Sequence, residues 1–217
     1  MTQNDTIFNA TIFNAIVDGD RESAVAEVLA ELERGVAPQH ILDLSLVPAM
    51  DRVSELFDAN EYFVPELMIS ARAMQGCMAV LDPHLKQSGV QKVGRVVLGT
   101  VQGDMHDIGK NLVGSMLEGG GFEVIDLGVN VAPDVFLEKA REKDGTIIGL
   151  SALLTTTMPA MRRVVELRDA LGLQGTHRVM IGGAPVTQDY ANEINADGYS
   201  ENAGGAVKLA RQLVTRS

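Results

Sequence analysis

The chain has 217 residues, enough for one large or two small domains, and 46% of them are hydrophobic. Its formal net charge of -11 argues against a nucleic acid or an anionic membrane surface as partner. It has no basic leader and no apolar run long enough to span a membrane, and its single cysteine, Cys77, cannot form an internal disulfide. We therefore expect a cytoplasmic protein in which Cys77 is a buried thiol.

The N-terminal part of the chain has the apolar spacing of helices only. Apolar residues recur at intervals of three and four between Ile7 and Leu81. Asp20 is typical of a helix N-cap, and Pro48 indicates a place where a helix breaks or restarts. The pattern predicts a four-helix bundle, which we assign to residues 1–88.

The pattern changes after a polar stretch, residues 86–92, which we interpret as a linker. Beyond it, short apolar runs alternate with helical patterns, which predicts a doubly wound parallel sheet of the flavodoxin-like class over residues 92–217. We expect strands at 94–101, 122–128, 146–151 and 178–182, with a short fifth near 197–199. We expect helices at 109–118, 133–143, 157–171, 187–195 and 203–214.

A polar loop with the pattern Asp-x-His-x-x-Gly follows the first predicted strand, at Asp104, His106 and Gly109. Open α/β sheets bind ligands at the C-terminal ends of their strands, where this loop would lie. A carboxylate two residues before an imidazole can accept its Nδ1 proton and leave Nε2 free to bind a metal. Taken alone, the pattern equally fits an exposed histidine beside a helix-capping aspartate.

Two further motifs follow later strands, Ser151-Ala152-Leu153 and Gly182-Gly183. Taken singly, the first fits a strand-end cap and the second an ordinary turn. In this order, the three motifs resemble the cobalamin-binding module of methionine synthase and of the small corrinoid proteins of methyltransferase systems. Residues 182–187 and 196–203 are most similar to the corrinoid proteins of methylamine and glycine-betaine-type systems.

The resemblance implies a set of roles for these residues. His106 would replace the benzimidazole of the cofactor as the lower axial ligand of cobalt, and Asp104 would hold its ring. Thr157 stands where the methionine synthase module has a serine, and it keeps the hydroxyl that completes a proton relay. The other histidines, His40, His84 and His177, lack such a partner and are interpreted as surface residues. The expected cofactor-binding residues are Asp104, Met105, His106, Asp107, Ile108, Gly109, Ser151, Leu153, Thr155, Thr157, Gly182 and Gly183, with Phe57 and Val64 over the upper face of the corrin.

The function implied by the resemblance is that of a methyl carrier without catalytic residues of its own. Its cofactor would be cobalamin, alternating between methylcobalamin and cob(I)alamin. Its partners would be a substrate-specific corrinoid methyltransferase, an acceptor-side methyltransferase acting on tetrahydrofolate or coenzyme M, and a reductive activase.

Three alternative functions share part of this sequence pattern. A cobalamin-binding regulator or light sensor commonly carries tryptophan and a basic helix, and this sequence has no tryptophan. A module of a radical isomerase would lack the helical region, and a flavodoxin-like protein without cobalamin would be colourless.

Overall fold

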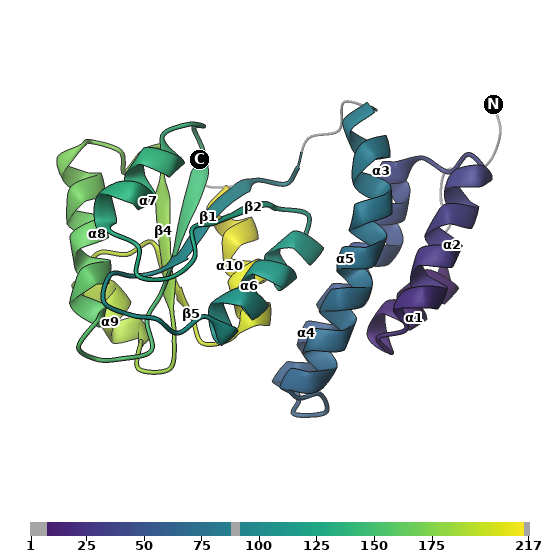
Figure 1. Ribbon diagram of the computed structural model, residues 1–217, viewed down its shortest axis with the longest axis horizontal. Helices are drawn as coiled ribbons and strands as arrows, with labels where there is room; N and C mark the ends of the chain where they lie inside the picture. The colour runs from purple at the N-terminus through teal and green to yellow at the C-terminus, as the bar shows by residue number, and fades with distance from the viewer. Residues whose placement is uncertain (1–7, 88–91, 215–217) are drawn as a thin grey trace. The chain divides into compact units, whose positions relative to one another are not determined.

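The computed structural model describes residues 8–87 and 92–214, which fall into two compact units (Figure 1). One unit comprises residues 1–92 with 118–121, and the other comprises 93–117 with 122–217. The predicted division of the chain at residues 88–92 stays a prediction, because residues 88–91 of the expected linker lie outside the described residues.

The first unit consists of helices. Apolar side chains of all the longer helices form its core, among them the fully buried Ile16, Val53 and Leu67. Cys77 is fully buried in the same core, which confirms the prediction for this thiol. The helical segments are α1 (Ala10–Val17), α2 (Arg21–Glu33), α3 (Pro38–Ile41), η1 (Leu42–Leu46), α4 (Val47–Asp58) and α5 (Val64–Gln87).

The helical path continues through Pro48, where the helix changes from the π to the α type. The segment before it, η1, is a π-helix, in which the N–H of Val47 donates to the carbonyl of Leu42, five residues earlier. Proline has no N–H, and its ring crowds the carbonyl four residues before it in an α-helix. The wider π turn directly before Pro48 therefore carries the helical path past this residue into α4.

The second unit is a doubly wound α/β fold, which confirms the predicted fold class. Its five strands are all parallel, in the order β2-β1-β3-β4-β5. The elements are β1 (Arg95–Thr100), α6 (Ile108–Gly119), β2 (Glu123–Asp126), α7 (Pro133–Ala140), β3 (Thr146–Ser151), α8 (Met158–Ala170), β4 (Arg178–Gly182), α9 (Gln188–Glu193), β5 (Gly198–Ser200) and α10 (Ala203–Val214).

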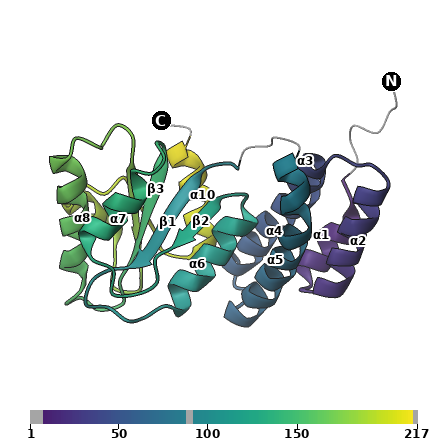
Figure 2. The same ribbon diagram turned by 45° about the horizontal axis from the view of Figure 1, so that its top comes forward.

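Helices cover both faces of this sheet. Figures 1 and 2 show α7 and α8 on one face and α6 and α10 on the other. One apolar core joins Val97 and Ile148 of the strands to Phe136 of α7 and Val164 of α8. Strands buried on both faces are apolar throughout, and this explains why the sequence predicts their positions well.

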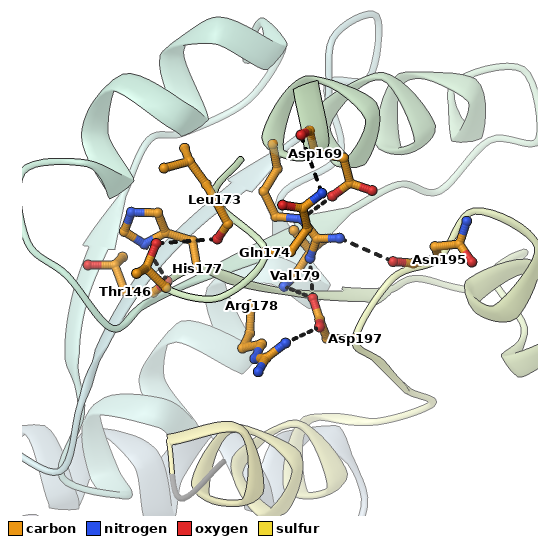
Figure 3. Close-up of polar contacts among 11 residues, drawn as sticks. Thr146, Asp169, Leu173, Gln174, His177, Arg178, Val179, Asn195 and Asp197 are labelled. Atoms are coloured by element: carbon orange, nitrogen blue, oxygen red, sulfur yellow. Dashed lines mark hydrogen bonds and ion pairs between the residues drawn. The ribbon is translucent and has the colours of Figure 1, made fainter. Parts of the chain in front are cut away.

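An ion-pair cluster ties the last part of the sheet to α8, at the edge where β4 begins (Figure 3). Asp197 is paired with the buried guanidinium of Arg168 and lies 3.1 Å from Nη1 of Arg178. The N–H of Val179 donates to the same carboxylate at 2.7 Å. These contacts place the chain just before β5 against β4.

The prediction that His177 lies on the surface is wrong. Its side chain is buried, and its Nδ1 lies 3.3 Å from the carbonyl oxygen of Thr146 (Figure 3). The N–H of Gly145 donates to the carbonyl of Thr176, so the connection before β4 lies along the start of β3. This contact between segments distant in sequence buries His177. Of the other two histidines, His84 is exposed and His40 is partly buried.

Within residues 8–87 and 92–214, no helix has the length and apolar character that crossing a membrane requires.

Candidate functional site

The sheet brings the three sequence motifs together at the C-terminal ends of its strands. In the strand register, Thr100 of β1 pairs with Ser151 of β3, and Ser151 pairs with Gly182 of β4. β1 lies between β2 and β3 in the sheet. The chain therefore goes from β1 to β2 on one side and then returns to β3 on the other side, so the strand order reverses between β1 and β3. A crevice forms at such a switch point, outside the C-terminal ends of the strands. The loop after β1, residues 101–107, lies there and is called the His106 loop below.

His106 presents a half-exposed imidazole at these strand ends. Its side chain is 51% exposed, and its Nδ1 lies 2.7 Å from Oδ1 of Asp104. The main-chain N–H of His106 donates to the same oxygen at 3.0 Å. An ionised carboxylate only accepts hydrogen bonds, so Nδ1 carries a proton, and in the neutral imidazole Nε2 then has the free lone pair. Among the described residues, Nε2 has no hydrogen-bond partner, which suits a metal ligand.

Asp104 is fully buried, and the loop after β3 surrounds its second oxygen. Oδ2 accepts hydrogen bonds from the N–H of Leu153 at 2.8 Å and from the N–H of Leu154 at 3.3 Å. Burial by itself raises the pKa of Asp104, but the hydrogen bonds from Leu153, His106 and Thr157 outweigh it and hold the pKa well below its usual range. The carboxylate is therefore ionised and fixed in orientation before any ligand binds.

The predicted hydroxyl contact of Thr157 is present in the structure. Its Oγ1 lies 2.8 Å from Oδ2 of Asp104 and 2.8 Å from the carbonyl oxygen of Leu154. One hydroxyl proton can be donated to only one acceptor at a time. Thr157, Asp104 and His106 thus form a connected row of polar groups, and its use as a proton relay stays a prediction.

The glycines of the site differ in whether the fold has room for a side chain. Gly183 has φ +128°, and a Cβ there would lie 1.9 Å from the carbonyl oxygen of Ala152. A Cβ at Gly182 would lie 3.0 Å from the carbonyl oxygen of Ser200. At Gly109, in the first turn of α6, a Cβ would meet nothing within 4 Å. The chain's own packing requires glycine at position 183 but not at position 109.

Large apolar side chains are exposed around His106. Met105 is 67% and Ile108 76% exposed, and Leu153 and Leu154 are each 43% exposed. All four lie on the His106 loop, at the start of α6, or on the loop that binds Asp104. Exposed apolar groups that gather around a polar group are typical of a ligand-binding site. A half-exposed imidazole with a free Nε2, an apolar surround and glycines at the strand ends fit cobalamin.

The remaining predicted residues are less clearly placed by contacts. Asp107 is exposed and precedes α6, where its carbonyl accepts from the N–H of Asn111 at 2.7 Å. Ser151 is partly buried at the end of β3, and Thr155 is exposed. In the helical unit, Phe57 is partly buried and Val64 is 43% exposed. The cobalamin-binding roles of these residues stay predictions.

Two residues that the sequence did not single out contribute to the site. Leu154 donates its N–H to Asp104 and exposes its side chain beside Leu153. Asn130, in the loop after β2, accepts from the N–H of Gly103 at 2.8 Å and donates its own N–H to the carbonyl of Asp104 at 2.9 Å. The sequence signal for Asn130 is its residue type alone, because asparagine tolerates a left-handed backbone better than most residues, and the structure has φ 54° there.

Comparisons with known proteins agree with this geometry. The sequence profile of the B12 binding domain matches residues 94–208, and a second profile of the same description matches residues 9–82. Dimethylamine corrinoid protein 3 of Methanosarcina acetivorans is 41% identical over 203 residues, covering 94% of this chain and 95% of its own.

Two solved structures extend the comparison to the fold. A cobalamin-binding protein from Desulfitobacterium hafniense has a TM-score of 0.79 at 33% identity, covering 93% of this chain and 96% of its own. A chain of the methanol:cobalamin methyltransferase complex of Methanosarcina barkeri also has a TM-score of 0.79, at 31% identity over 94% of this chain and 78% of its own. The protein described here therefore belongs to the B12-binding domain family.

Proposed function

We propose that the protein is a corrinoid methyl carrier, in which His106 holds the cobalt of cobalamin. The observation that carries the proposal is the buried, ionised Asp104 bound to Nδ1 of a half-exposed imidazole whose Nε2 is free. Cobalamin supplies a cobalt centre that takes up a methyl group from one partner and gives it to another. The resemblance to corrinoid proteins extends over almost the whole chain.

The protein's own residues divide the task of holding the cofactor. His106 would hold the cobalt, and Asp104 and Thr157 would determine where the imidazole carries its proton. Met105, Asp107, Ile108 and Leu153 would contact the corrin around it. Ser151, Thr155, Gly109, Gly182 and Gly183 would line the slot for the displaced nucleotide tail.

The upper face is assigned to the helical unit. Phe57 and Val64 would cover the methyl-bearing side of the corrin, as the resemblance implies. Val64 is exposed at the first residue of α5, and Phe57 is partly buried in α4. A covered upper face would have to open before a partner could reach it.

The chain works within a methyltransferase system, and the enzymes that deliver and remove the methyl group are its partners. The relatives differ in the donor that their names give, dimethylamine in one and methanol in the other. We assign the choice of donor to a substrate-specific corrinoid methyltransferase. An acceptor-side methyltransferase, using tetrahydrofolate or coenzyme M, and a reductive activase complete the proposed set, in the cytoplasm.

A regulatory or sensory function gains no support. The relatives described above are a corrinoid protein, a cobalamin-binding protein and a methyltransferase complex. The carrier function accounts for the site without a further domain.

The axial ligand can be tested directly. The protein is loaded with cobalamin, reduced to the Co(II) form and examined by electron paramagnetic resonance with nitrogen-15 histidine. We expect the nitrogen splitting to change with the label, and His106→Ala to lose it. Coupling to the benzimidazole nitrogen instead would refute the proposal. The loaded protein should accept a methyl group only when a partner methyltransferase is added.

A further inference from the structure

We propose that Thr100 is a positioning residue for His106, which fixes the main chain of the His106 loop to the sheet. Thr100 is the last residue of β1 and is fully buried. Its hydroxyl donates a hydrogen bond to the main-chain carbonyl of His106 at 2.8 Å. The inference rests on the proposed function, because it gives Thr100 a role only through His106.

His106 needs such a contact because packing does not hold it. Its side chain is half exposed, and both its ring Nδ1 and its main-chain N–H bind one atom, Oδ1 of Asp104. Two contacts to one oxygen leave the residue free to pivot about that oxygen. The bond from Thr100 holds a third point, the carbonyl, and so fixes the direction in which the imidazole points.

Thr100 is itself held rigidly. Its N–H donates to the carbonyl of Gly128 at 2.9 Å, and its carbonyl accepts from the N–H of Val131 at 3.0 Å. It also pairs with Ser151 in the central strand β3. A group presented from a strand that is paired on both sides is placed more exactly than one presented from a loop.

The burial of β1 supports a specific role for the Thr100 hydroxyl, that of holding the His106 loop. Every residue of the strand is buried, and a buried hydroxyl is stable only when it has a hydrogen-bond partner. The partner of the Thr100 hydroxyl is the main-chain carbonyl of His106. At the other end of the loop, Asn130 binds the main chain of Gly103 and Asp104. The main chain of the loop is thus held on both sides of Asp104, by Asn130 at Gly103 and Asp104 and by Thr100 at His106.

Thr146 provides a matched control. It is also fully buried, is the first residue of β3, and donates its hydroxyl to the carbonyl of Lys143 at 2.5 Å. β1 and β3 are neighbouring parallel strands. Because Thr146 begins β3 whereas Thr100 ends β1, Thr146 lies at the N-terminal ends of the strands, away from the His106 loop. Valine at either position removes one buried hydroxyl and puts a methyl group against a carbonyl.

The experiment compares Thr100→Val, Thr100→Ser and Thr146→Val in the full chain. In the cofactor-free protein, amide hydrogen exchange of His106 and Leu153 is measured relative to Ile148 in the core of β3. Both amides of interest donate to Asp104 and report on its position. We expect Thr100→Val to speed their relative exchange about fivefold, the factor that corresponds to one hydrogen bond of average strength. Thr100→Ser and Thr146→Val should leave the ratio unchanged.

The second readout is the dissociation constant of hydroxocobalamin, measured by its visible absorption. It should rise about fivefold in Thr100→Val, by the same hydrogen-bond estimate, and stay near the wild-type value in Thr146→Val. Equal effects of the two valine substitutions on either readout would show that Thr100 is only structural and would overturn the inference. If wild-type Co(II) shows no histidine coupling, the proposed function fails, and the exchange ratio in the cofactor-free protein still decides the role of Thr100.

Discussion

At the scale of single residues, Gly109 and Gly183 lie in opposite steric surroundings. A Cβ at Gly183 would collide with the main chain of Ala152, whereas a Cβ at Gly109 would meet open space. Glycine also weakens a helix, and Gly109 is in the first turn of α6. The packing of the chain therefore does not explain the glycine at position 109, and its proposed place in the slot for the nucleotide tail can be tested.

This contrast predicts opposite effects of alanine on the cofactor-free protein. We expect Gly109→Ala to raise the free energy of unfolding by about 0.5 kcal/mol, because alanine favours the helix. It should nevertheless weaken hydroxocobalamin binding, because the new methyl group would occupy the tail slot. Gly183→Ala should lower the free energy of unfolding by roughly 3 kcal/mol through main-chain strain. Urea unfolding and absorption titration measure the two quantities, and undiminished binding by Gly109→Ala would remove Gly109 from the slot.

At the scale of elements, the start of β4 and the chain before β5 depend on one buried ion pair. Arg168 of α8 is 3% exposed, and its guanidinium is bound by Asp197, Asp169 and the carbonyl of Asn195. Asp197 in turn accepts from the main chain of Val179. A buried charge that loses its partner is expensive, whereas an exposed ion pair contributes little.

We therefore expect Asp197→Ala to lower the free energy of unfolding by about 3 kcal/mol, because the buried Arg168 keeps only one carboxylate, that of Asp169, and the N–H of Val179 loses its acceptor. The matched control is Glu193→Ala, which removes the exposed ion pair between Arg162 and Glu193. That change should lower the free energy of unfolding by less than about 1 kcal/mol. Chemical denaturation of the two variants side by side measures the difference, and similar losses would contradict the assignment of Asp197 as a structural centre.

At the scale of the whole molecule, Cys77 reports on the helical unit. Its burial raises the pKa of the thiol to about 12, with the Arg21 guanidinium offsetting part of that effect. The thiolate is the reactive form, so Cys77 should react with a thiol reagent only when the helical unit opens. The rate of labelling at a fixed pH then measures that opening.

If Phe57 and Val64 cover the corrin, cobalamin binding should stabilise the helical unit as well as the α/β unit. We expect saturating hydroxocobalamin to slow the labelling of Cys77 by about tenfold or more, by binding linkage. The double variant Phe57→Ala, Val64→Ala should lose most of this protection while keeping the His106 signal. Labelling that is unaffected by cobalamin in the wild type would contradict the assignment of the upper face.

Much of the fold follows from the sequence because its signals are local. Strands buried on both faces are apolar runs, so β3 and β4 have the predicted bounds of 146–151 and 178–182. The ends of elements depend less on local sequence signals. The predicted strand 122–128 is shortened to Glu123–Asp126, where the side chain of Asp126 accepts from the N–H of Gly128 and the chain turns. The predicted helix 133–143 ends at Ala140.

By itself, the sequence determined the order of the three motifs, the choice of His106 and its pairing with Asp104, because these residues are neighbours along the chain. Only the tertiary structure decided which main-chain groups meet polar side chains far along the chain. The amides of Leu153 and Leu154 bind Asp104 across about fifty residues, and His177 lies beside the carbonyl of Thr146 across 31 residues. The hydroxyl of Thr100 on His106 likewise depends on how the loop folds back on the strand. The physical reason is the strand order. β1 and β3 are neighbours in the sheet although β2 lies between them in sequence, so the loops that follow β1 and β3 lie side by side, and no local sequence pattern connects these two loops.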